Sequence, residues 1–165
     1  MDANDEKLTT RRLGDRDDVR DTLFALAGHA RRQIDICAAA LDPYFFNTAR
    51  FVDALGHFCA AHQRNRVRIL TDNSERLLRD NVRLAETCRQ LSDFIQIHAP
   101  GEEHGELNEM FMITDTSAFL RQPDITRHEF VLCVDDRPRT VQLRKRFDHI
   151  WERSEQIVGL HPVGL

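Results

Sequence analysis

Polar side chains that could take part in acid–base or phosphate chemistry gather in the last third of the chain. Asp115 and Glu129 are carboxylates, and His104 or His128 could act beside one of them as a general base. A nearby arginine could hold an anion through its two-pronged guanidinium group. The residues that we single out as candidates for one pocket are Asn108, Met110, Asp115, Ser117, Arg127, His128 and Glu129.

Each of these residues also has a purely structural explanation, and the sequence leaves both open. Asp115 can begin the turn 114–117 by accepting hydrogen bonds from backbone amides. Glu129 can pair with Arg127, and His128 can be an exposed histidine without a chemical role. Met110 lies in an apolar run and is a natural core residue.

Metal-binding and disulfide patterns are absent from the sequence. Four cysteines are widely spaced in apolar stretches, which suits buried, reduced thiols: Cys37, Cys59, Cys88 and Cys133. Histidine and glutamate are dense in 98–106, but their spacing matches no closed zinc site. We therefore predict neither a metal ion nor another cofactor.

Arginine dominates the basic residues, because only Lys7 and Lys145 are lysines among the 23 basic side chains. Lys7 lies in the N-terminal lead-in and Lys145 in the last helix, so neither is expected near the strand at 109–114. Arg76, Arg79 and Arg83 recur at helical spacing and could contact nucleic-acid phosphates. Acidic residues interleave with them, so a solvated face of ion pairs is the favoured explanation. The net charge of −4 gives no general attraction to nucleic acid or anionic lipid.

The elements that must position these side chains follow one another in a regular order. Apolar runs predict strands at 34–41, 66–70 and 94–98, and helical periodicity predicts helices between them. An alternation of strand and helix is typical of a parallel sheet with crossover helices. Three closely spaced strands then follow at 109–114, 117–121 and 128–134, and a last helix starts near Arg139.

We therefore predict a single α/β domain with a mixed, mostly parallel sheet and helices on both faces. Residues 1–14 are expected to be a flexible lead-in, 15–155 the folded domain and 156–165 a tail. No apolar run is long enough to span a membrane, and no signal-peptide pattern is found. These features favour a cytoplasmic, bacterial protein that does not bind membranes.

The order of elements resembles one half-unit of the phospholipase D superfamily. That family carries the motif H-x-K-x4-D on a strand and F-x-x-x-W on the final helix. Here the segment 108–115 (NEMFMITD) falls at the motif, and Phe147 and Trp151 match the helical pattern. The segment 127–136 (RHEFVLCVDD) resembles a later family strand that carries a glutamate.

The resemblance implies a degenerate motif. In catalytic members the histidine attacks a phosphodiester, the lysine binds the phosphate oxygens, and the aspartate orients a histidine. Asn108 stands at the histidine position and Met110 at the lysine position, so only Asp115 matches. An amide nitrogen is not a nucleophile, and a thioether carries no charge to hold a phosphoryl group.

The first hypothesis is accordingly a catalytically inactive phospholipase D-like domain that acts as a binding or scaffold module. Its partner would be a phosphate-containing ligand or a protein, and the resemblance implies a homodimer. The alternative is an enzyme of other chemistry, using His104 or His128 with Asp115 or Glu129. A third hypothesis is a nucleic-acid-binding module that uses the arginine faces.

Overall fold

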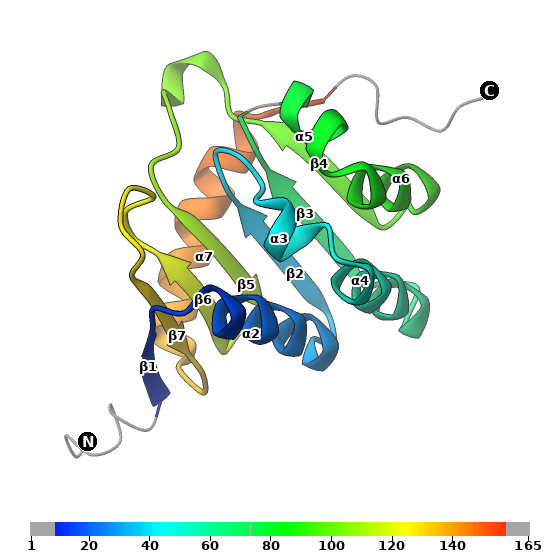
Figure 1. Ribbon diagram of the computed structural model, residues 1–165. Helices are drawn as coiled ribbons and strands as arrows, with labels where there is room; N and C mark the ends of the chain where they lie inside the picture. The colour runs from blue at the N-terminus through cyan, green and yellow to red at the C-terminus, as the bar shows by residue number, and fades with distance from the viewer. Residues whose placement is uncertain (1–8, 73, 158–165) are drawn as a thin grey trace.

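One sheet of eight strands runs through the centre of the molecule (Figure 1). The computed structural model describes residues 9–72 and 74–157. The strand order across the sheet is β1-β7-β6-β5-β2-β3-β4-β8. The strands are β1 (Thr10–Leu13), β2 (Gln33–Cys37), β3 (Arg66–Leu70), β4 (Ile95–Ala99), β5 (Met110–Thr114), β6 (Ala118–Gln122), β7 (Phe130–Cys133) and β8 (Glu155–Gln156).

Helices cover both faces of this sheet, as Figure 1 shows. One face carries α2 (Arg16–His29), α3 (Pro43–Phe46), α4 (Ala49–Ala61), α5 (Ser74–Asp80) and α6 (Val82–Gln90). The long helix α7 (Arg137–Glu152) covers the other face. Side-chain caps start four of the described helices: Asp15 for α2, Asp42 for α3, Thr48 for α4 and Asp136 for α7.

The mixed sheet is confirmed, but parallel pairing is the minority. Among the strand pairs of the described residues, β2–β3 and β3–β4 are parallel and the other five are antiparallel. The expectation of a mostly parallel sheet is therefore corrected. The physical reason is that β5, β6 and β7 follow one another without crossover helices, and β5 lies antiparallel beside β2.

The sheet extends beyond the expected folded range of 15–155. Thr10–Leu13 of the expected lead-in pair with β7, so this segment forms an edge strand. Gln156 of the expected tail pairs with His98 of β4, and Ile157 is buried. Residues 1–8 and 158–165, the remainder of the predicted lead-in and tail, lie outside the described residues.

Two hydrophobic clusters fill the two sides of the sheet. Alternate residues of a strand point to opposite faces, and β2 shows this clearly. Ile34 and Ile36 join the cluster beneath α2 and α4, whereas Cys37 joins the cluster beneath α7. Asp35 faces the α7 side as well and is completely buried, with 0% of its surface exposed.

Candidate functional site

Asn108 lies just before β5, at the end of the sheet where this inner strand begins. It lines a cavity of about 520 Å³ between this end of the sheet and α7, which we call the β5-edge cavity. The β6–β7 loop closes over it, because the Ile125 N–H donates to the Asn108 carbonyl oxygen at 3.1 Å. The other lining residues are Cys37, His104, Glu106, Leu107, Glu109, Arg121, Pro123, Lys145, Arg146, His149 and Ile150.

Met110, at the position of the family lysine, does not line this cavity. Only 4% of its surface is exposed, and it belongs to the hydrophobic cluster on the α2 side of the sheet. Phe45 and Phe130 are in the same cluster and meet edge to face at 6.1 Å. The structure therefore supports the core interpretation of Met110.

Asp115 lies at the opposite end of β5 from Asn108. A strand rise of about 3.3 Å per residue places the two roughly 20 Å apart. The Asp115 carboxylate accepts hydrogen bonds from the backbone N–H groups of Arg31, Arg32 and Gln33, at 2.8–3.2 Å. It thus fastens the α2–β2 connection to the end of β5, in line with its structural explanation. Asp115 and Ser117 line a separate groove of about 560 Å³ beside α2.

Arg127, His128 and Glu129 are exposed on the β6–β7 loop, because β7 begins at Phe130 rather than at 128. Buried Gln122 anchors this loop by donating to the Arg127 carbonyl oxygen at 2.8 Å. The loop lies at the same end of the sheet as Asn108. The structure therefore brings Asn108 and the three loop residues 127–129 to one end of the sheet. It leaves Asp115 and Ser117 at the other end.

The acid–base pairs of the alternative hypothesis are not assembled. His104 lines the β5-edge cavity, whereas Asp115 lies at the far end of the sheet. Across residues 9–72 and 74–157, no histidine side chain forms a hydrogen bond with a carboxylate. The same part of the chain contains no group of three metal-ligating side chains placed around one point.

Charged side chains dominate one wall of the β5-edge cavity. Glu109, with a side chain 13% exposed, accepts from Arg121 Nε at 2.8 Å and also pairs with Arg146. Lys145 lines the same cavity from α7, which corrects the expectation that neither lysine lies near the motif strand. Glu109 was not among the sequence candidates. Its place between a helical arginine and a strand arginine arises only when α7 packs on the sheet.

Buried Asp35 fixes the position of α7. Its carboxylate accepts from Arg68 at 2.8 and 2.9 Å and from Arg144 Nε at 2.9 Å. Arg68 also donates to Asp148 of α7 at 2.8 Å, so both arginines connect the sheet and the helix. Because Arg144 directly precedes Lys145, this ion-pair network holds the cationic wall of the cavity in place. A lone aspartate inside the apolar run 34–41 is the signal that sequence reasoning missed.

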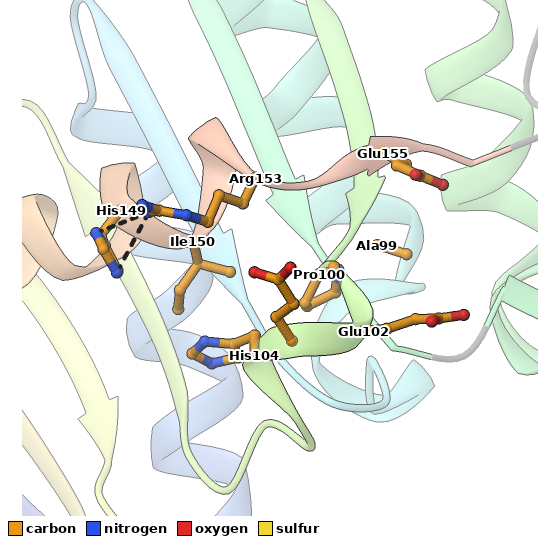
Figure 2. A pocket seen from close by; sticks show the side chains of 10 residues that line it. Ala99, Pro100, Glu102, His104, His149, Ile150, Arg153 and Glu155 are labelled. Atoms are coloured by element: carbon orange, nitrogen blue, oxygen red, sulfur yellow. Dashed lines mark hydrogen bonds between the residues drawn. The ribbon is translucent and has the colours of Figure 1, made fainter.

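A second cavity of about 960 Å³ adjoins the first and shares His104, His149 and Ile150 with it. Figure 2 shows His104 on the segment that follows β4, opposite Ile150 and Arg153 at the end of α7. Arg153 hydrogen-bonds the imidazole of His149 at 3.2 Å. Nearby, His98 stacks on Trp151 at 3.9 Å, and its burial lowers the pKa of the imidazole. Both cavities therefore lie against the C-terminal part of α7.

The arginine face expected at positions 76, 79 and 83 is interrupted. The predicted helix is two helices, and buried Asn81 lies at the break. Arg76 and Arg79 pair with Asp80 on α5, while Arg83 belongs to α6. The arrangement favours solvated ion pairs over one continuous phosphate-binding face.

The cysteine prediction is confirmed, since all four thiols are free and buried. Burial raises the pKa of Cys59 to about 11 and that of Cys88 to about 12. No helix in the described part of the chain is long and apolar enough to cross a bilayer.

Solved structures resemble this fold over nearly its whole length. Nuc from Salmonella typhimurium, a phospholipase D family member, is 12% identical over 90% of this chain and 97% of its own, with a TM-score of 0.64. Phosphatidylserine synthase from Haemophilus influenzae is 14% identical over 96% of this chain and 40% of its own, with a TM-score of 0.66. TrmBL2, an archaeal chromatin protein with a novel mode of DNA binding, is 13% identical over 90% of this chain, with a TM-score of 0.64.

These likenesses confirm the phospholipase D-like fold, and at such low identity they concern the fold alone. The chain spans 54% of TrmBL2 and 40% of the synthase. No curated protein matches the sequence. A family model described as "Domain of unknown function (DUF7931)" matches residues 15–162, and the chain belongs to this family.

Proposed function

We propose that this phospholipase D-like domain is catalytically inactive and binds a phosphate-bearing ligand in the β5-edge cavity. The burial of Met110 carries the first half of the proposal. A methionine packed in the hydrophobic core replaces the lysine that would hold phosphate oxygens, and Asn108 replaces the nucleophile. Loss of both groups removes the reaction of the family by many orders of magnitude.

The charge of the cavity supports the second half. Three cationic side chains, Arg121, Lys145 and Arg146, meet two carboxylates, Glu106 and Glu109. Arg121 gives only its Nε to Glu109, and Arg146 gives only one terminal nitrogen. The remaining donors of both guanidinium groups have no partner among the described residues. A phosphate group with several acceptor oxygens satisfies such donors.

The resemblance to single-motif family members also leads us to propose a homodimer that acts in the cytoplasm. Light scattering coupled to size-exclusion chromatography measures the mass directly. A mass near twice 19.2 kDa supports this part of the proposal, and a monomer mass overturns it.

A thermal-shift experiment with inorganic phosphate and a glycerophosphodiester tests the ligand proposal. A ligand at about 100 times its Kd adds about 2.7 kcal/mol to the unfolding free energy. For a domain of this size that raises Tm by roughly 5–10 °C. The test variant is Arg121→Gln with Lys145→Gln, which removes two cations from the cavity.

The control variant, Arg50→Gln with Arg137→Gln, removes the same charge outside it. Arg50 pairs with Asp21 on the α2 side, and Arg137 is exposed at the start of α7. We expect the control to keep the ligand-induced shift and the test variant to lose it. Equal losses in both variants, or no shift in the unmodified protein, contradict the proposal.

A further inference from the structure

Four arginines gather at the end of the sheet opposite the β5-edge cavity. Arg31 and Arg32 directly precede β2, and Arg64 and Arg66 lie at the start of β3. The two strands are neighbours in parallel register, with Gln33 opposite Arg66. The Arg66 N–H donates to the Arg32 carbonyl oxygen at 3.2 Å, which extends the pairing into the loops. Because adjacent strands are about 4.8 Å apart, the four residues form one group, the amino-end arginine cluster.

No carboxylate neutralises this cluster. Most arginines on the helices form ion pairs, as Arg16, Arg50 and Arg79 do. Among the described residues, none of the four guanidinium groups of the cluster forms an ion pair. The carboxylate of Asp115, at the same end of the sheet, is already occupied by the backbone N–H groups of Arg31, Arg32 and Gln33.

The side chains of Arg32 and Arg66 are held in place, while their charge stays available. Arg32 donates to the Asn65 side-chain oxygen at 3.4 Å, and Arg66 donates to the carbonyl oxygens of Gln63 and Asn65 at 2.8 Å. Asn65 is itself buried and donates to the Phe58 carbonyl oxygen at 2.7 Å. All four arginines are exposed, and hydrogen bonds hold the side chains of two of them, Arg32 and Arg66.

Arginines in such a group fit a polyanion with regularly spaced phosphates. A guanidinium group can bind a phosphodiester through two parallel hydrogen bonds. A membrane surface is less suitable, because interfacial binding also needs apolar side chains that enter the bilayer. The exposed large hydrophobic residues of the described chain are Val82 and Ile125, and neither lies in these loops.

We propose that the amino-end arginine cluster binds the phosphate backbone of nucleic acid without reading its base sequence. This surface is separate from the β5-edge cavity, so either proposal can fail while the other holds. It also differs from the face of Arg76, Arg79 and Arg83, in which two arginines are already paired with Asp80.

Fluorescence anisotropy of a labelled DNA duplex over a range of salt concentrations tests the proposal. Four phosphate contacts give a slope of log K against log salt of about −3.6. Affinity then falls by roughly 150-fold between about 50 and 200 mM salt. The variant Arg31→Ala with Arg64→Ala loses about half of that slope, and its decrease is roughly 12-fold. Within the described part of the chain neither side chain makes a hydrogen bond, so the variant is expected to keep the wild-type Tm.

The matched control is Arg76→Ala with Arg79→Ala, which makes the same change in net charge on α5. We expect the control to keep the full slope. Undetectable duplex binding, or an equal loss of slope in both double variants, overturns the proposal. Phosphatidylserine vesicles provide a further comparison. Binding to the vesicles but not to the duplex also overturns the proposal, because a lipid surface is then the ligand.

Discussion

Replacement of Asp115 with alanine separates a structural role from a ligand-binding role at the one residue that matches the family motif. The structure assigns three backbone N–H donors to this carboxylate, from Arg31, Arg32 and Gln33. Each lost hydrogen bond costs about 0.5–1.5 kcal/mol once water replaces part of it. The substitution is therefore expected to lower the unfolding free energy by roughly 2–4 kcal/mol. The corresponding decrease in Tm is about 5–15 °C.

Asp135 provides a matched control, because Asp115 and Asp135 both have a φ of 52°. Alanine is strained in this left-handed region at either position. Only Asp115, however, accepts the three backbone hydrogen bonds, so the difference between Asp115→Ala and Asp135→Ala isolates their contribution. Asp115→Asn keeps one acceptor oxygen and tolerates the left-handed conformation, and we expect an intermediate Tm.

Guanidinium denaturation and thermal melting of these variants provide the measurement. The structural account is refuted if Asp115→Ala is no less stable than Asp135→Ala. It is also refuted if Asp115→Ala abolishes phosphate binding while its Tm stays that of the unmodified protein. In that case Asp115 would belong to a ligand site that the geometry does not show.

Three further predictions follow from buried groups. Asp35→Ala leaves two arginines without their carboxylate and is expected to cost about 3–5 kcal/mol of unfolding free energy, measured by denaturation; a loss below about 1 kcal/mol contradicts the ion-pair network. Because burial raises the pKa of Cys59 and Cys88 to about 11 and 12, the native protein should show no thiol reactive with a disulfide reagent near neutral pH, and four in denaturant. Burial lowers the pKa of His98, so the unfolded state takes up a proton below about pH 6.5 that the folded state does not. The free energy of unfolding should therefore decrease as the pH is lowered through that range, and it should decrease less steeply in His98→Gln. The fluorescence of Trp151 follows the unfolding, and an equal pH dependence in both proteins contradicts this assignment.

Local sequence patterns were sufficient for most individual elements. The alternating run at 66–70 is β3 as predicted, and Thr48 caps α4. Such features depend on a few adjacent residues. The partner of each strand does not, and the sequence could not show that β5 lies antiparallel beside β2. The prediction of a mostly parallel sheet failed at that long-range choice.

The candidate site shows the same limit. Motif spacing placed Asn108 and Asp115 in one segment. The strand β5 lies between them, however, so the two residues are at opposite ends of the strand and line different cavities. Asp35 was visible as a charge in an apolar strand, yet its partners come from β3 and α7. Glu109 and Lys145 join one cavity only because α7 packs against the sheet.

Phosphorus NMR of a glycerophosphodiester titrated with the protein tests the central claim most directly, since one spectrum reports both binding and cleavage. An inactive binding module broadens or shifts the ligand resonance and produces no new one. The same titration with Arg121→Gln and Lys145→Gln should leave the resonance unchanged. A product resonance that grows with protein concentration, or a ligand resonance that the unmodified protein leaves unaltered, would contradict the account.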